Sequence, residues 1–199
     1  MENYVALDCE MVGLKTNRGT SMLAQVSIVG PDGEPLYNEF VKPPPTLNLD
    51  TIDYRTLFSG ITKEILQTKA RYSFAKVQSD VKEILKGKTI VGHALENDFR
   101  ALQLDPSNYT VMDTAHAPWF MQIRWDPRSL KRLAADLLEN KQIQTETHNA
   151  LEDARTSMEL FRKYQEKFRL TPAEAIADRG MKKGGTRRRD RRRRYTRRR

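Results

Sequence analysis

Short apolar runs, each closed by a turn signal, predict three strands at the start of the chain. Residues 4–10 form one such run, and residues 22–29 form a second that ends at the Gly-Pro-Asp-Gly turn 30–33. Residues 35–41 follow directly, so the second and third strands should form a hairpin. The three prolines at 43–45 end this hairpin and begin a long loop that runs through residue 60.

Helical spacing of apolar residues becomes prominent further along the chain. A stripe of five apolar residues predicts a helix over 74–86 with Ser73 as its N-cap. Gly87 should stop this helix. The remaining predicted elements are strands over 89–92 and 109–112 and helices over 95–102, 129–138 and 149–168.

This order of elements predicts an α/β fold. Three antiparallel strands followed by strand–helix units give a five-stranded mixed sheet with helices on both faces. We expect the domain to occupy residues 1–170, because Thr171 and Pro172 close the last helix. Residues 171–181 should form a linker, and residues 182–199 a disordered, arginine-rich tail that cannot bury apolar surface.

The positive charge of the chain is concentrated in that tail. Residues 182–199 hold 12 Lys and Arg and one acid, a net +11, whereas the other 181 residues hold 23 Lys and Arg and 25 acids, a net −2. An arginine run of this density is typical of a nucleic-acid contact or a nuclear address, so RNA or nuclear import receptors are its expected partners. A tail that only improves solubility is the alternative, although acidic tails serve that purpose better.

Neither a disulfide nor a membrane partner is expected. Cys9 is the only cysteine, so no internal disulfide can form, which fits a reducing compartment. No apolar run approaches the length of a membrane span, and nothing near Met1 resembles a signal peptide.

The first strand ends in two acids. Asp8 and Glu10 occupy positions of an apolar run although carboxylates are costly to bury. Residues i and i+2 of a strand point to the same face, so both carboxylates enter one small volume. Hard oxygen ligands at that spacing suit Mg²⁺ or Mn²⁺. The alternative is a strand edge that turns towards solvent.

Two later segments carry acids and histidines that could complete such a site. Asp98 follows the strand over 89–92, and Asp153 lies in the opening turns of the last helix, at the edge of the face that packs on the sheet. Each is alternatively an acid that favours the dipole of its helix. His93 lies beside a buried strand, which favours a structural role, whereas His148 follows a polar loop that could carry a base to water. The residues alone leave the choice between the two histidines open.

The order of these residues resembles a known family. Five positions recur in three motifs of the DEDDh 3′–5′ exonucleases, which have a ribonuclease-H-like fold: Asp8-x-Glu10, Asp98 after Val91-Gly92-His93, and His148-x(4)-Asp153. The local sequence is similar to the eukaryotic RNA exonuclease branch, which includes interferon-stimulated and ribosomal-RNA-processing exonucleases. The resemblance covers about residues 4–168. Ala94 departs from the Asn of many other DEDDh enzymes, which removes a polar substrate contact but no metal ligand.

The resemblance implies a metal-dependent hydrolase. Two divalent cations, Mg²⁺ or Mn²⁺, would be held by Asp8, Glu10, Asp98 and Asp153, with Asp98 acting either directly or through water. His148 would be the general base, and an imidazole with a pKa near ~6.5 suits that role at neutral pH. These five residues are therefore the expected catalytic group.

The residues expected to bind substrate are Met11, Arg55, Ile61 and Thr62. Met11 follows the second acid and could contact the terminal base or ribose, with core packing as the alternative. Arg55, Ile61 and Thr62 lie in a segment that resembles the part of the family that packs on the terminal nucleotide. A solvated loop arginine is the alternative for Arg55.

We therefore expect a metal-dependent 3′–5′ exoribonuclease that releases nucleoside monophosphates and processes precursors such as ribosomal RNA in the nucleus, specifically the nucleolus. The main alternative within the class is an exonuclease that acts on single-stranded DNA. A non-catalytic RNA-binding module and a glycosidase, which also uses two carboxylates, are the alternatives from other classes.

Overall fold

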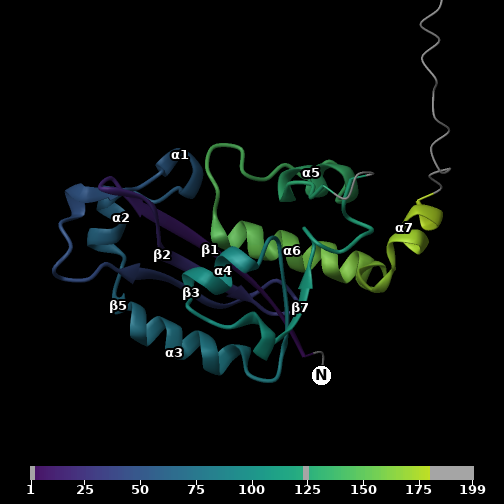
Figure 1. Cartoon of the computed structure of the whole chain (residues 1–199), viewed down its shortest axis with the longest axis horizontal. Coiled ribbons are helices and arrows are strands. Elements are labelled where there is room, and N and C mark those ends of the chain that lie inside the picture. The colour runs from purple at the N-terminus through teal and green to yellow at the C-terminus, as the bar shows by residue number, and fades with distance from the viewer. Residues whose placement is uncertain (1–2, 123–125, 180–199) are drawn as a thin grey trace, which may run out of the picture.

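A mixed sheet forms the centre of the computed structural model, which describes residues 3–122 and 126–179 (Figure 1). Its strand order is β5-β3-β2-β1-β6-β7, with β4 paired to β1. The strands are β1 (Tyr4–Leu14), β2 (Asn17–Val29), β3 (Pro35–Lys42), β4 (Ile52–Asp53), β5 (Tyr72–Ser73), β6 (Thr89–Gly92) and β7 (Thr110–Asp113). The α/β class and the five-stranded mixed core are confirmed, and β4 and β5 add two strands of two residues each.

The central strand β1 has both kinds of neighbour. It pairs antiparallel with β2, where Asp8 faces Ser27, and parallel with β6, where Val5 faces Ile90. Both β1 and β2 are longer than expected, because their pairing continues to Leu14 and Asn17 on either side of a tight turn. The strand β1 therefore lies inside the sheet, between β2 and β6.

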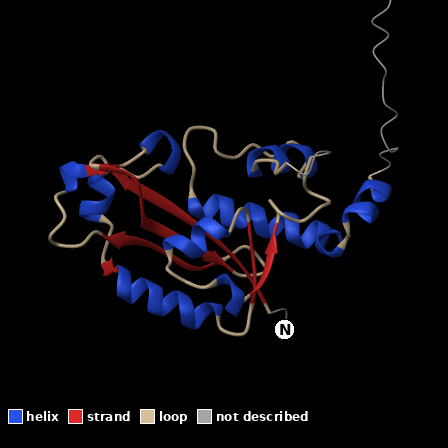
Figure 2. Cartoon of the chain, in the orientation of Figure 1, coloured by secondary structure: helices blue, strands red, loops and turns tan. Residues whose placement is uncertain are grey.

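Helices cover both faces of this sheet (Figure 2). They are α1 (Thr56–Ser59), α2 (Lys63–Thr68), α3 (Phe74–Leu85), α4 (Glu96–Ala101), α5 (Leu130–Leu137), α6 (Ala150–Tyr164) and α7 (Pro172–Asp178), with 3-10 turns at Leu49–Thr51, Pro106–Asn108 and Gln165–Arg169. Ser73 and Ser129 cap α3 and α5 as expected, each accepting a hydrogen bond from the third backbone N–H of its helix.

Alternate residues of β1 belong to different hydrophobic clusters. Leu7 and Cys9 pack with buried residues of α3 and α4, whereas Ala6 packs with Ala154 and Met158 of α6. Because both Ala6 and Ala154 are small, the backbone of α6 can approach β1 closely at this point. The even-numbered positions of β1, which include Asp8 and Glu10, therefore share the face on which α6 lies.

The segment after α6 differs from the expected linker. Within residues 171–181, α7 forms because the Thr171 hydroxyl and the Glu174 carboxylate make a reciprocal capping box. The indole of Trp119 donates to Asp178 at 2.7 Å and Lys167 bonds the same carboxylate, so α7 is fastened to the domain. It lies at the end of the molecule opposite to α1 and α2 (Figure 1).

The expected basic tail, 182–199, lies outside the described residues. None of the helices in the described ranges is long and apolar enough to cross a membrane.

Candidate active site

Asp8 and Glu10 stand on β1 at the point where its ladder becomes irregular. Glu10 pairs with Gln25, and a register shift follows between Glu10 and Met11. Such a bulge re-aims side chains at the end of regular pairing. Glu10 is 7% exposed and Asp8 is partly exposed, so the two carboxylates lie at the margin of the core rather than on an open strand edge.

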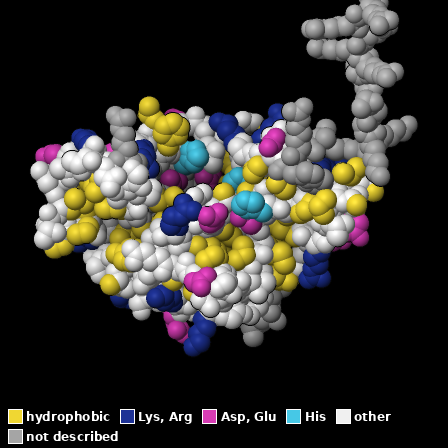
Figure 3. Space-filling view, viewed as in Figure 1, with side chains coloured by type: hydrophobic (Ala, Val, Ile, Leu, Met, Phe, Trp, Pro, Cys, Tyr) yellow, Lys and Arg dark blue, Asp and Glu magenta, His cyan; other side chains and the backbone are white. Residues whose placement is uncertain are grey.

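The opening of α6 brings a third carboxylate to the same place. Asn149 caps the helix by accepting hydrogen bonds from the N–H groups of Leu151 and Glu152. Asp153, one turn later, is 3% exposed. One ligand atom from each of Glu10, His148 and Asp153 lies within 4.8 Å of the other two. Figure 3 shows acidic side chains beside a histidine in the hollow below α1.

The fourth carboxylate comes from α4, which covers the other face of β1. Asp98 is 4% exposed, and its helix begins after Ala94, whose φ of +57° lies in the left-handed region. Asp113, at the end of β7, accepts hydrogen bonds from the N–H groups of Ala94 and Leu95 at 2.9 Å each. Asp113 thus fixes the turn that aims Asp98. An acid at the end of a strand is the signal that marks such a residue, and Asp113 was assigned no role from the sequence.

The carboxylates perturb one another strongly. Burial, followed by the charges of Asp153 and Asp98, raises the pKa of Glu10 to about 8. Burial also raises the pKa of Asp98 to about 8, against hydrogen bonds from Cys9 that lower it. Desolvation and then the charges of Asp98, Asp153 and Glu10 raise the pKa of Asp8 well above its usual value. Four crowded acids therefore cannot all ionise at neutral pH without a compensating cation.

The carboxylate of Asp153 fits a position beside a divalent cation. Burial raises its pKa to about 6, as burial also raises the pKa values of the other three acids. Its Oδ2 accepts a hydrogen bond from Gln144, whereas its buried Oδ1 has no hydrogen-bond partner among the described residues. A buried carboxylate oxygen without a donor is a free position for a hard cation. Asp8, Glu10, Asp98 and Asp153 are the residues that would hold it.

The two histidines differ in their surroundings. His148 is 45% exposed, and its Nδ1 lies 3.8 Å from Asp153 Oδ2. Desolvation and the charge of Lys131 lower the pKa of His148, so its ring is neutral at pH 7 and can accept a proton. His93 instead bonds Thr114 Oγ1 at 2.8 Å through Nδ1. The geometry favours His148 as the base and a structural role for His93.

Of the residues expected to contact substrate, Met11 lies on β1 and Arg55 lies beside it. Met11 is half-buried against the core cluster of α3 and α4. Arg55 crosses over Gly13, donates to the Thr20 carbonyl oxygen at 3.2 Å and pairs with Asp53 at 3.5 Å. In this conformation the Arg55 guanidinium ties the β1–β2 hairpin to β4, so its expected contact with substrate stays a prediction.

Ile61 and Thr62 have structural roles here. The Ile61 side chain is fully buried, and its N–H and carbonyl groups bond the hydroxyls of Ser59 and Thr56. Ile61 is therefore part of the core in this structure, because an apolar side chain in this loop is more stable there. Thr62 caps α2 by accepting a hydrogen bond from the N–H of Ile65. The expected contacts of Ile61 and Thr62 with substrate stay predictions.

The same loop brings residues to the site that the sequence did not single out. Leu57 and Phe58 of α1 are 82% and 69% exposed, and the carbonyl oxygen of Phe58 accepts a hydrogen bond from the N–H of His148. The pattern of apolar residues offered no signal for them, since an isolated apolar pair in a loop is common.

The chain is similar in sequence to known nucleases. A family model described as Exonuclease (RNase_T) matches residues 5–161. RNA exonuclease 4 of Mycosarcoma maydis is 40% identical over 168 residues, which are 83% of this chain and 43% of that protein. Apoptosis-enhancing nuclease of Rattus norvegicus is 38% identical over 79% of this chain and 47% of its own length. The chain thus spans about half the length of the curated relatives it matches.

Solved structures agree with this fold. The Pan2 catalytic unit of Neurospora crassa superposes with a TM-score of 0.71 at 27% identity, covering 92% of this chain and 30% of that one. The Pan2 RNA exonuclease module of Saccharomyces cerevisiae in complex with AAUUAA RNA gives a TM-score of 0.70 at 28% identity, covering 90% and 30%.

Proposed function

This chain belongs to the RNase_T exonuclease family, the DEDDh 3′–5′ exonucleases that its motifs resemble, and we propose that it hydrolyses RNA from the 3′ end to nucleoside monophosphates. One observation carries the proposal. Four carboxylates from β1, α4 and α6, which are far apart in the sequence, perturb one another's ionisation beside the imidazole of His148. Such a cluster does not stabilise the fold, because burying like charges together destabilises the folded protein.

In phosphodiester hydrolysis, the four acids would bind cations and His148 would accept a proton. Two bound Mg²⁺ or Mn²⁺ ions would lower the pKa of the attacking water and neutralise the leaving oxygen. Asp8, Glu10, Asp98 and Asp153 would hold these ions and leave a nearly neutral site that accepts a phosphate. His148 would take the proton of the water, since its lowered pKa keeps the ring neutral at pH 7.

RNA is the substrate that the comparisons favour. One relative is named an RNA exonuclease, and the Pan2 exonuclease module binds RNA in its solved structures. Single-stranded DNA is the second candidate, because the carboxylates and His148 would act on either backbone. Proteins distinguish the two through the 2′-OH of the ribose. Met11, Arg55, Ile61 and Thr62 are the proposed contacts with the terminal nucleotide.

A role in processing RNA such as ribosomal RNA, in the nucleus and specifically the nucleolus, completes the proposal. Its support is the arginine-rich segment 182–199, with a net charge of +11 against a slightly acidic domain. Such a segment would attract RNA over long distances or bind nuclear import receptors, while the metals supply positive charge at the scissile bond.

Cleavage of matched oligonucleotides tests the proposal. A 5′-labelled RNA with a free 3′-OH should shorten stepwise in Mg²⁺ or Mn²⁺, and the same RNA with a blocked 3′ end should persist. EDTA and the variant Asp153→Asn should each abolish shortening. A DNA of the same sequence measures the preference for RNA. Cleavage that begins inside the strand, or none in either metal, would contradict the proposal.

A further inference from the structure

Gln144 makes three contacts with residues far from its own turn. Its backbone N–H donates to Glu152 Oε2 at 3.0 Å, and its carbonyl oxygen accepts from Lys131 Nζ at 2.9 Å. Its side-chain Nε2 donates to Asp153 Oδ2 at 2.8 Å. One residue thus joins α5, α6 and the loop that leads to His148.

The backbone of Gln144 adopts an unfavourable conformation to make these contacts. Its φ is +52°, in the left-handed region that residues other than glycine rarely occupy. Such a conformation is destabilising and persists where surrounding contacts hold it. Glu139 and Asn140, with φ of +55° and +61°, share this conformation at the start of the same loop. The loop is therefore held in place by its contacts rather than by its local preferences.

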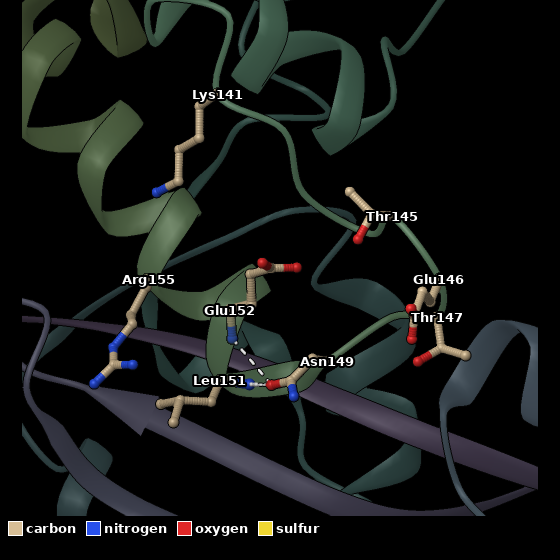
Figure 4. Close-up of a pocket in the computed structure, with 8 residues that line it drawn as sticks. All are labelled: Lys141, Thr145, Glu146, Thr147, Asn149, Leu151, Glu152 and Arg155. Carbon is tan, nitrogen blue, oxygen red and sulfur yellow. Dashed lines mark hydrogen bonds between the residues drawn. The ribbon is translucent and has the colours of Figure 1, made fainter.

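The loop has little other support on this side. Figure 4 shows residues 145–147 standing away from α6 across a recess of about 510 Å³, which is also lined by Leu151, Glu152 and Arg155. Within the described residues, no hydrogen bond joins 145–147 to α6. Gln144 fastens the loop before this gap, and the hydrogen bond from the His148 N–H to the Phe58 carbonyl oxygen fastens it after the gap.

The contact with Asp153 has a chemical consequence. One oxygen of the carboxylate, Oδ2, accepts from the Gln144 amide and lies 3.8 Å from His148 Nδ1. The other, Oδ1, has no hydrogen-bond partner in the part of the chain that the structure describes. A neutral amide fixes the orientation of the carboxylate without cancelling its charge. Donors of this kind orient metal-binding carboxylates, and their loss typically weakens metal affinity or activity about 10–100-fold.

We propose that Gln144 is a positioning residue that orients Asp153 towards a divalent cation and ties the loop carrying His148 to that carboxylate. The inference rests on the proposed function, because it assigns Asp153 to metal binding. It assigns Gln144 no contact with substrate.

Substitution of Gln144 by Met tests this role. Gln144→Met keeps the length of the side chain and both backbone hydrogen bonds but removes the amide donor. Gln142→Met is the matched control, since Gln142 is exposed in the same loop and its side chain, among residues 3–122 and 126–179, bonds only the Asn140 carbonyl oxygen. Mn²⁺ affinity is measured by titration calorimetry, folding by thermal unfolding, and kcat and KM with a 3′-hydroxyl RNA.

We expect Gln144→Met to weaken Mn²⁺ affinity about 10–100-fold and to lower kcat, with KM for RNA changed less than about twofold. Gln142→Met should match the wild type in all three measurements. Gln144→Asn, which shortens the amide by one methylene, gives the same comparison should the Met variant unfold.

Mn²⁺ affinity equal to that of the wild type in the folded variants would overturn the role of Gln144, even with a lowered unfolding temperature. A wild-type protein that binds Mn²⁺ but cleaves no RNA would contradict the proposed function alone, because the effect of Gln144 on Mn²⁺ affinity would still be measured.

Discussion

The backbone N–H of His148 donates a hydrogen bond to the carbonyl oxygen of Phe58, 2.8 Å away. These residues are far apart in the sequence, so this bond joins the loop before α6 to the α1 segment. Gly60 lies at the same contact with φ +67°, and a Cβ placed on it would come within 2.9 Å of the His148 carbonyl oxygen. The position of the proposed base therefore depends on a glycine in another loop.

Gly60→Ala should displace His148. We expect a loss of about 1–2 kcal/mol in the free energy of unfolding from the left-handed backbone, together with a fall in kcat. Gly87→Ala is the matched control, because Gly87 has the same φ of +67° and nothing within 4 Å of its added Cβ. It should lose similar stability and keep kcat. Denaturant unfolding and single-turnover kinetics measure the two effects, and equal kcat in both variants would contradict the coupling.

The stability of the metal-free protein should fall as pH rises from about 4 to about 8. The raised pKa values of Glu10, Asp98 and Asp153 mean that the native state binds more protons than the unfolded chain in this range, so the free energy of unfolding decreases with pH. Divalent cations should reverse part of the loss, because they replace the protons.

Thermal unfolding in EDTA across this range checks the prediction. Glu10→Gln removes one of the mutually repelling acids, so its unfolding temperature should decline less than that of the wild type between pH 6 and 8. A decline of the same size in both proteins would show that Glu10 does not carry a raised pKa.

His148→Ala should lower kcat by about 10²–10⁴-fold, the usual contribution of a general base. The acidic limb of the wild-type pH profile should report a pKa below 6.5, since desolvation and Lys131 lower it, and this limb should vanish in the variant. Because His148 also lies within 4.8 Å of two carboxylates, Mn²⁺ affinity is the second measurement. A large fall in Mn²⁺ affinity would identify His148 as a metal ligand rather than a base.

Deletion of residues 182–199 should weaken RNA binding and flatten its dependence on salt, because the segment carries 12 Lys and Arg. The chemical step at saturating RNA should change little, since the carboxylates and His148 lie outside the deleted segment. Binding measured at several salt concentrations compares the full and shortened chains. Equal salt slopes would leave localisation as the role of the segment.

Local rules predicted the parts of the molecule that depend on neighbours in sequence. The spacing of Asp8 and Glu10 on a strand, the cap at Ser73 and the apolar stripe that follows it all depend on periodicity, and the structure has them as expected. The order of the motifs predicted that the later acids would meet the strand acids: one ligand atom from each of Glu10, His148 and Asp153 lies within 4.8 Å of the other two, and the charge of Asp98 raises the pKa of Glu10. The family and the α/β fold followed from these features.

Contacts between segments that are distant in the sequence could not be predicted from local sequence patterns. The bonds from Asp113 to the turn before α4 and from Gln144 to Asp153 depend on how distant segments meet. Ile61 is buried by residues such as Val12 and Leu66, which no pattern within its own loop indicates. The helix α7 was missed because its capping box lies beside a Pro that was interpreted as a stop, although Pro also suits the first turn of a helix.

Mn²⁺ binding by the metal-free protein tests the central claim most directly, namely that Asp8, Glu10, Asp98 and Asp153 together bind divalent cations. Titration calorimetry of the wild type, in the presence of a nucleoside monophosphate, should show heat of binding and release of protons that increases from pH 8 towards pH 6, because the carboxylates are then more protonated. Asp8→Asn and Asp153→Asn should each abolish or strongly weaken uptake. A folded wild-type protein that takes up neither Mn²⁺ nor Mg²⁺ under these conditions would contradict the account.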